Sequence, residues 1–275
     1  MLRIFNFNTL LTFLDQNTRS LHVQLKNGEN NYITTEMILE LENLLNWAHS
    51  HIEINSLYFS SKNEYFSHGI DPKVLESLDE KQLEGYTLQI NKIIDSILNI
   101  PQTTIINIGK GCMNFASELA LAFDLRISRS DASMQFEHSA LGTIPTAGGI
   151  NLLSTLIHPS FAKNVLLGTH SINYKELQSS HLVFKQYNSD KDRLKLQKEL
   201  LLSLNKQSSV ARIQTKLGIN QTMVEQLEKN NEIQQSIFKA FMLTKDWKSK
   251  KEFTKPREVK KSVSKLRLIK SEDLQ

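Results

Sequence analysis

One stretch of this 275-residue chain, residues 104–149, constrains the fold more than any other. It begins with an apolar run at 105–108 that predicts a strand, and two glycines follow at positions 109 and 111. A helix is then predicted from about Asn114 to Phe123, and its only charged side chain is Glu118. Because an unpaired ion is costly to bury, we expect this carboxylate to have a partner or a chemical function.

The second half of this stretch supplies another candidate for acid/base chemistry. A short strand predicted over 133–136 leads to Glu137 and His138, just before a glycine-containing segment at 141–149. Histidine exchanges protons near neutral pH, so His138 and Glu118 together form a candidate acid/base pair. Two structural alternatives stay open. Glu118 is also favoured by the dipole at a helix start, and His138 could be an ordinary hydrogen-bonded histidine beside a loop.

Composition and charge exclude several classes of protein. The chain is 40% apolar and 23% charged, which is typical of soluble globular proteins, and its single cysteine excludes an internal disulfide and a cysteine-based zinc site. No apolar run reaches the ~18 residues of a membrane span and no signal-peptide pattern is visible, so we expect a cytoplasmic protein with no membrane partner.

The positive net charge of +4 is carried by the C-terminal segment 245–270, which holds eleven basic and three acidic residues. Such a run is typical of a solvated tail, and binding of an anionic phosphate group is the sharper alternative. No nucleic-acid partner is expected, because neither an aromatic platform nor a known reader motif accompanies the basic residues.

Strand and helix patterns alternate up to residue 188, and only helical patterns follow. This order predicts an α/β core over 1–188 with buried parallel strands, and a helical, oligomerising region with a basic tail over 189–275. The predicted strands are 21–25, 56–59, 105–108, 133–136 and 182–184. The first predicted helix is capped by Thr34 or Thr35. The other predicted helices are 80–98, 114–123, 150–157, 161–167, 174–178, 193–205, 210–217 and 222–243.

Five segments in order resemble the crotonase superfamily, that of enoyl-CoA hydratase and isomerase. They are 31–34, 66–71, 114–124, 141–149, and 166–172 with 182–183. The family motifs they resemble are Asn-Ala-Leu-Thr, Phe-Ser-Ala-Gly-x-Asp, Gly-Gly-Gly-x-Glu-Leu-Ala-x-Ala-x-Asp, Leu-Gly-x-x-Pro-x-x-Gly-Gly, and Leu-x-Gly-x-x-Ile with Gly-Leu-Val. The resemblance covers roughly residues 20–187.

The resemblance implies a fold of ββα units wound into a spiral, with two roughly perpendicular sheets and a C-terminal helical domain. It also implies a homotrimer, often paired into a hexamer. The ligand it implies is an acyl thioester of coenzyme A or of an acyl-carrier protein. No cofactor is expected besides the coenzyme A of the substrate, and no metal.

The resemblance further implies the roles of individual residues. The backbone amides of Ile70 and Phe115 would form an oxyanion hole for the thioester oxygen. Glu118 matches the first acid/base glutamate, and His138 stands at the position of the second. Residues implied to contact coenzyme A or the substrate are Ser67, His68, Gly69, Asp71, Asn114, Gly142 and Lys255.

The largest departure from the family pattern lies at the helix start, where Asn114, Phe115 and Ala116 replace the glycine triplet. A glycine there lets a ligand approach the backbone closely, whereas the Phe115 ring must enter either the core or the acyl pocket. Two hypotheses follow: an enzyme acting on an acyl thioester by hydration, isomerisation, hydrolysis or decarboxylation, or a non-catalytic scaffold or thioester-binding protein. A ring in the acyl pocket favours the second hypothesis, and a ring in the core favours the first.

Overall fold

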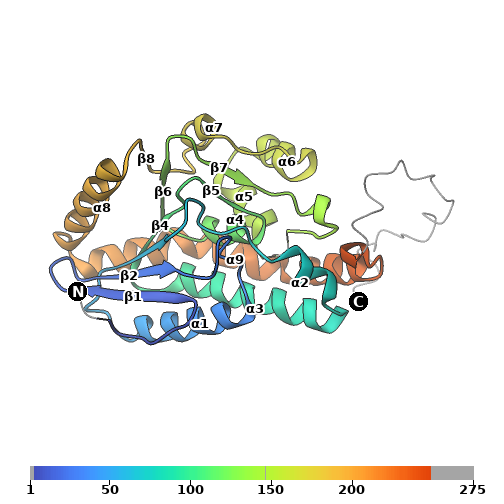
Figure 1. The fold of residues 1–275 in the computed structure, drawn as a ribbon, viewed down its shortest axis with the longest axis horizontal. Coiled ribbons are helices and arrows are strands. Elements are labelled where there is room, and N and C mark those ends of the chain that lie inside the picture. Colours follow the sequence, from blue (N-terminus) through green and yellow to red (C-terminus); the bar gives the residue numbers. More distant parts are fainter. Residues whose placement is uncertain (1–2, 146, 249–275) are drawn as a thin grey trace.

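The computed structural model describes residues 3–145 and 147–248. A six-stranded sheet lies at its centre (Figure 1), and all neighbouring strands are parallel except the first pair, which is antiparallel. In sheet order the strands are β1 (Leu10–Asp15), β2 (Ser20–Leu25), β3 (Ser56–Ser61), β4 (Thr103–Asn107), β6 (Leu125–Arg129) and β8 (Lys185–Tyr187). A second, two-stranded parallel sheet pairs β5 (Gly111–Met113) with β7 (Ser133–Gln135).

Both faces of the larger sheet are covered, which explains why all five residues of β4 are buried. Alternate side chains of a strand point to opposite faces. On one face, Leu57 and Ile106 pack in the main core with α1 (Thr35–His49) and α3 (Glu80–Asn99), two helices in mutual contact. On the other face, Tyr58 and Ile105 pack against α8 (Asp190–Asn205). The sheet is therefore the middle layer of the fold.

Both predicted core helices are present. The Thr34 hydroxyl accepts a hydrogen bond from the Met37 amide at 3.2 Å and so caps α1, one of the two predicted caps. At the start of α3, Asp79 and Gln82 form a capping box that was not predicted. The other helices are α2 (Pro72–Ser77), α4 (Phe115–Leu121), α5 (Gly149–Leu156), α6 (Pro159–Gly168), α7 (Tyr174–Ser179) and α9 (Ser209–Met242), with the 3-10 turns η1 (Ser139–Leu141) and η2 (Asp246–Lys248).

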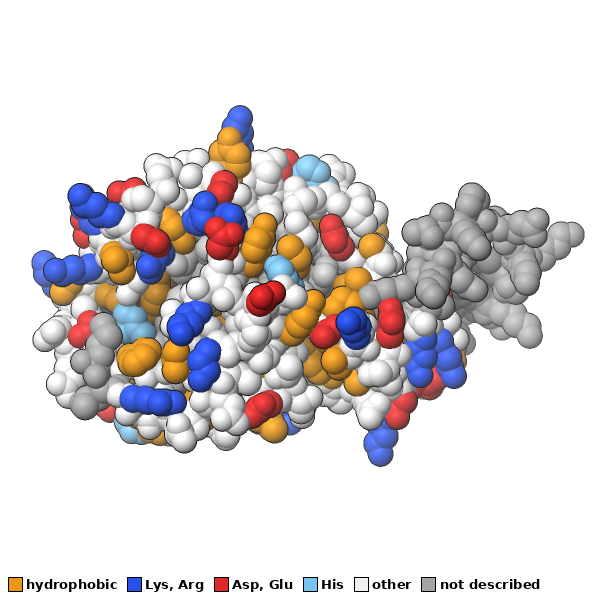
Figure 2. Space-filling model, in the orientation of Figure 1, with side chains coloured by type: hydrophobic (Ala, Val, Ile, Leu, Met, Phe, Trp, Pro, Cys, Tyr) orange, Lys and Arg blue, Asp and Glu red, His pale blue; other side chains and the backbone are white. Residues whose placement is uncertain are grey.

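Helix α9 runs along the molecule (Figure 1) and packs against α3 and α5. Its buried Lys216 donates hydrogen bonds to the carbonyls of Ile97 and Gln102 and forms an ion pair with Asp124 at 2.9 Å. These contacts satisfy carbonyls at the end of α3 that have no partner within the helix. Figure 2 shows acidic and basic side chains interspersed over the visible face, not segregated by sign.

The structure corrects two sequence predictions. The strand predicted at 182–184 is wrong, because β8 begins only at Lys185. Leu182 and Val183 are buried by core packing, and the Leu182 carbonyl accepts from the Arg126 side chain, not from a strand neighbour. The separate helices predicted at 210–217 and 222–243 are one helix, since Gly218 lies in open space within α9 and does not interrupt it.

The division of the chain at residue 188 stays a prediction. Across the described residues, no helix combines the length and the apolar character that a membrane crossing requires. Within the same residues, no group of three or more metal-binding side chains is placed to hold an ion.

Candidate active site

Two backbone amides on neighbouring segments have no acceptor among the described residues. The loop after β3 carries Ile70, and Phe115 opens α4. Neither amide donates a hydrogen bond to any described residue. Gly69 lies between them at φ +82°, and a Cβ there would stand 3.3 Å from the Phe115 nitrogen and 2.8 Å from the Met113 oxygen. Glycine at position 69 therefore allows the two amide-bearing segments to approach each other.

The loop that carries Ile70 is held by backbone hydrogen bonds on both sides. The Phe66 amide donates to the Gly111 carbonyl at 2.9 Å, and the Met113 amide donates to the Ser67 carbonyl at 3.1 Å. On the opposite side, the Ile33 amide donates to the Gly69 carbonyl at 2.8 Å. Because the loop is bonded both to β5 and to the segment before α1, the Ile70 amide is positioned before any ligand binds.

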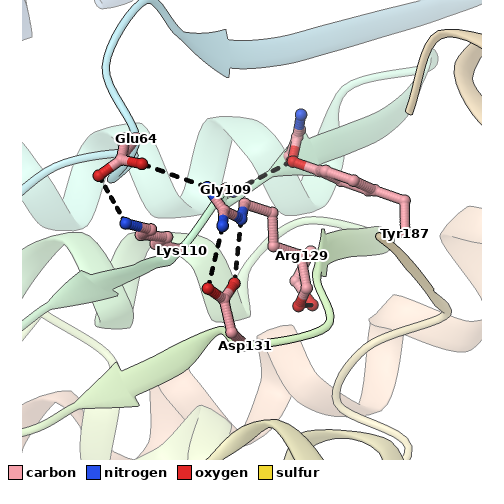
Figure 3. A network of polar contacts seen from close by, with 8 residues as sticks. Glu64, Gly109, Lys110, Arg129, Asp131 and Tyr187 are labelled. Atoms are coloured by element: carbon pink, nitrogen blue, oxygen red, sulfur yellow. Dashed lines mark hydrogen bonds and ion pairs between the residues drawn. The ribbon is translucent and has the colours of Figure 1, made fainter. Parts of the chain in front are cut away.

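A charged network supports this loop from the surface (Figure 3). Glu64 pairs with Lys110 at 2.6 Å and with Arg129 at 3.2 Å, and Arg129 also pairs with Asp131. The hydrogen bond from Lys110 is the main cause that lowers the pKa of the Glu64 carboxyl. The network joins the residues before the loop to the β4–β5 turn. There the Lys110 amide also donates to the Glu64 carbonyl at 2.7 Å.

Glu118 and His138 meet in the interior. Their side chains are 0% and 1% exposed, and His138 Nε2 lies 2.7 Å from Glu118 Oε1. The second carboxylate oxygen, Oε2, accepts a hydrogen bond from the Gly149 amide at 2.8 Å. The remaining imidazole nitrogen, His138 Nδ1, is buried and has no hydrogen-bond partner within the part of the chain that the structure describes. The structure thus brings the two predicted acid/base residues into direct contact.

Sequence reasoning missed the contribution of Gly149 to this pair. A Cβ at position 149 would lie 2.7 Å from both Cγ and Oε2 of Glu118, so only glycine fits against the carboxylate. The signal that could have found it is the glycine pair that opens α5, where Gly148 has φ +88°. A glycine pair at a helix start permits close backbone approach to an acidic group.

Asn114 occupies the N-cap position of α4, but its side chain does not cap the helix. Instead its Oδ1 accepts a hydrogen bond from the Glu137 amide at 2.7 Å, and its own amide donates to the Gln135 carbonyl at 2.8 Å. The residue adopts φ 52° and ψ −120°, a region that is strained for any side chain except glycine. The two hydrogen bonds hold the segment that delivers His138 against the start of α4.

The Phe115 ring lies beside the buried pair. It is 1% exposed and belongs to the main hydrophobic core. It meets the His138 ring edge-on at 5.3 Å between centroids, and the Tyr86 ring of α3 at 5.8 Å. The Tyr86 hydroxyl is fixed by donating to the Ile33 carbonyl at 2.6 Å. The Phe115 ring therefore lies between His138 and Tyr86 of α3 and covers the Glu118–His138 pair on that side.

Other predicted residues serve the loop. Ser67 is buried, and its hydroxyl donates to the Asn31 carbonyl and accepts from the Gly69 amide. His68 lies beside the rings of Tyr32 and Tyr65, and partial burial lowers its pKa.

Asp71 caps α2 by accepting from the Lys73 amide at 2.8 Å, and its implied contact with coenzyme A or the substrate stays a prediction. Next to it, a pocket of about 310 Å³ opens beside Ile70, with Val74, Leu78 and Tyr86 among its lining residues.

One predicted contact residue lies apart from this group. Gly142, at φ +64°, packs against the C-terminal η2, where an added Cβ would lie 2.5 Å from the Asp246 carbonyl oxygen. Its position thus favours a packing role. Lys255 lies outside the described residues.

The fold matches that of solved enoyl-CoA hydratase structures. An enoyl-CoA hydratase from Bacillus halodurans superposes with a TM-score of 0.81 at 19% identity, covering 88% of this chain and 98% of that one. An enoyl-CoA hydratase from Mycobacterium avium subsp. paratuberculosis superposes with a TM-score of 0.78 at 17% identity, covering 90% and 96%. At such identities these likenesses establish the fold alone.

The chain belongs to the enoyl-CoA hydratase/isomerase family, whose pattern matches residues 16–261. This membership confirms the resemblance indicated by the five sequence segments. Human mitochondrial methylglutaconyl-CoA hydratase is 29% identical over 188 residues, which cover 66% of this chain and 54% of that protein. The mouse protein of the same name is also 29% identical. The chain spans a little over half the length of these mammalian relatives, 54% to 59%.

Proposed function

We propose that this protein binds an acyl thioester and transfers a proton at the carbon next to the thioester carbonyl. The observation that carries the proposal is that the Ile70 and Phe115 amides have no acceptor among the described residues, and that Phe115 also contacts His138, which is hydrogen-bonded to Glu118. The amides would hold the carbonyl oxygen as it becomes an enolate. One good donor of this kind is worth roughly 3–4 kcal/mol in the transition state.

The proposed ligand is an acyl group on coenzyme A or on an acyl-carrier protein. Family membership and the coenzyme A thioesters named in the relatives support this class of ligand. The pocket beside Ile70 offers space next to one of the two amides. Because Glu118 and His138 share a hydrogen bond, they act as one proton-transfer unit. This arrangement supports chemistry that moves one proton per step.

Calorimetric titration tests the proposal. We expect at least one of acetyl-CoA, crotonyl-CoA and a long-chain acyl-CoA to bind more tightly than free coenzyme A. Only a thioester presents a carbonyl oxygen to the two amides. We also expect Glu118→Gln to lose turnover while retaining binding. If no thioester binds, or if Glu118→Gln turns over every active thioester at the wild-type rate, the proposal is wrong.

A second candidate function, thioester binding without turnover, is favoured by the burial of the acid/base pair, whose side chains are at most 1% exposed. The Phe115 ring contacts His138 but lies in the hydrophobic core, and a ring in the core favours the enzyme. Phe115→Gly and Phe115→Leu separate the two candidates. If the wild type binds thioesters without turnover and only Phe115→Gly gains it, the binding function holds for the natural sequence.

We also propose a homotrimer, which could pair into a hexamer. Support comes from large apolar side chains exposed on α9, with Val210 at 70% and Ile219 at 66% exposure. Light scattering coupled to size-exclusion chromatography tests this directly. We expect about three or six times the 31.5 kDa of one chain, and a single-chain mass would contradict the proposal.

A further inference from the structure

One atom of the buried pair has no hydrogen-bond partner among the described residues. Both oxygens of Glu118 are engaged in hydrogen bonds, one with His138 and one with the Gly149 amide. His138 Nδ1, in contrast, is buried, and no described residue bonds to it. Leaving a buried polar atom unpaired costs roughly 1–3 kcal/mol. The unpaired Nδ1, in a pair whose other polar atoms are hydrogen-bonded, points to a ligand that interacts with this nitrogen.

The tautomer of His138 follows from the charge of Glu118. When Glu118 is ionised it has no hydrogen to donate, so Nε2 is then the donor in the hydrogen bond between the two side chains. In the neutral ring, Nδ1 then holds a lone pair and is the proton acceptor. A carboxylate that fixes the tautomer of a histidine and stabilises its charged form is a known device for making that histidine a base.

We propose that His138 Nδ1 takes the proton from the α-carbon of the bound thioester, and that Glu118 is the positioning residue that holds His138. The inference rests on the proposed function. The α C–H bond breaks, its electron pair forms an enolate whose oxygen lies at the Ile70 and Phe115 amides, and the proton moves to Nδ1. Glu118 stabilises the resulting imidazolium. The imidazolium proton then exchanges with solvent, and transfer of a proton from Nδ1 back to the same carbon restores the thioester.

Two contacts make Glu118 unsuited to be the base itself. Each of its two oxygens is already engaged in a hydrogen bond, one with His138 and one with the Gly149 amide. Its carboxylate also packs directly against Gly149, with no room for even a methyl group between them. His138, in contrast, contacts the ring of Phe115, the residue whose amide would hold the carbonyl oxygen. The His138 imidazole therefore contacts the same residue, Phe115, that supplies one amide of the oxyanion hole.

Deuterium exchange at the α-carbon tests the role of His138. Acetyl-CoA or butyryl-CoA is incubated with the full-length protein in D₂O, and exchange is followed by mass spectrometry. We expect His138→Gln to slow exchange at least about 100-fold, the usual contribution of a positioned acid/base group. His170→Gln is the matched control, because His170 forms an exposed pair with Glu176 at 2.8 Å. This control should exchange at the wild-type rate.

Glu118→Gln gives the readout for positioning. Losing the carboxylate makes the imidazolium less stable, so we expect a slower reaction and a pH–rate profile shifted to lower pH. Wild-type exchange that persists in His138→Gln but disappears in Glu118→Gln would make Glu118 the base and overturn the inference. Thioester binding by calorimetry without any exchange would also overturn it. Absence of thioester binding would instead refute the proposed function.

A measurement on the unaltered protein keeps the inference testable if the variants do not fold. Nitrogen-15 NMR of the histidine side chains distinguishes the two tautomers directly. We expect His138 to carry its hydrogen on Nε2 in the free protein and the Nδ1 signal to move when acetyl-CoA is added. A hydrogen found on Nδ1 at neutral pH would contradict the proposed base.

Discussion

Two carboxylates of this protein each hold a basic side chain at nearly the same distance, but water reaches only one of them. Glu118 lies 2.7 Å from His138 with both side chains at most 1% exposed, whereas Glu64 lies 2.6 Å from Lys110 with exposures of 62% and 28%. An exposed pair gains little because water and salt screen it, whereas breaking a buried pair leaves a charge without solvation. The two pairs therefore differ in their contribution to stability because one is buried and the other is exposed, and not because their distances differ.

The two pairs also serve the site in different ways. The Glu64 network stands on the surface and supports the loop that carries Ile70, but the backbone hydrogen bond between Lys110 and Glu64 supports it as well. The Glu118 pair is bonded to the start of α5 and has one unsatisfied nitrogen. We therefore expect surface changes to leave the site intact and changes in the buried pair to disrupt it.

The largest effect is expected for His138→Ala. Removing the imidazole leaves Glu118 buried with a single donor, so we expect the free energy of unfolding to fall by about 3–5 kcal/mol. Urea unfolding at neutral pH measures it. His170→Ala is the control, because it breaks an exposed pair of similar length and should cost less than about 1 kcal/mol. Equal losses in the two variants would remove the distinction between buried and exposed pairs.

A pair of intermediate exposure sharpens the comparison. Lys216 and Asp124 lie 2.9 Å apart with side chains 6% and 18% exposed. Lys216→Met deletes this pair and two hydrogen bonds to carbonyls, so we expect a loss of about 2 kcal/mol. Thermal and urea unfolding give the value. A loss as small as that of His170→Ala would show that partial burial does not strengthen the pair.

A neutral contact beside the buried pair is expected to matter less. Asn114→Ala keeps the strained backbone but loses the acceptor for the Glu137 amide, so we expect a loss of about 1–2 kcal/mol. Asn114→Gly loses the same acceptor but relieves the strain, so it should be less destabilising than alanine. If the alanine variant is the more stable of the two, the backbone at Asn114 is not strained.

The smallest effect is expected for Glu64→Gln, whose carboxylate is open to solvent. We expect a slight fall in melting temperature at low ionic strength that disappears in high salt. Because the folded pKa of Glu64 is lowered, the network stabilises the protein above the ordinary glutamate range, and this contribution is lost as pH falls through the lowered pKa. Wild type and variant should therefore converge in melting temperature at acidic pH. A difference that persists there would contradict this assignment.

Motif spacing placed the central residues correctly in relation to each other. The strand–helix order and the five family segments predicted that Glu118 and His138 belong to one site, and the structure brings them into contact. The contact with Gly149 could not be predicted in the same way, because it joins residues 31 positions apart through close packing. The unpartnered Nδ1 is likewise a property of the packed interior and leaves no sequence signal.

The fold was predicted best where local signals agreed with packing. The Thr34 cap and the apolar stripe of α1 are examples. β1 was missed because its apolar residues lie in a segment interrupted by polar ones, and its pairing with β2 is what makes it a strand. α9 was divided because Gly218 weakens a helix locally, whereas contacts of Lys216 and Asn220 with the end of α3 stabilise the helix through that point.

The central claim is that the Ile70 and Phe115 amides receive a thioester oxygen. Nitrogen–proton NMR of these two amides during titration with acetyl-CoA, and separately with free coenzyme A, tests it most directly. We predict that both amide proton signals move downfield with acetyl-CoA and that neither does so with free coenzyme A. Saturable binding of acetyl-CoA with both amide signals unchanged would contradict the claim.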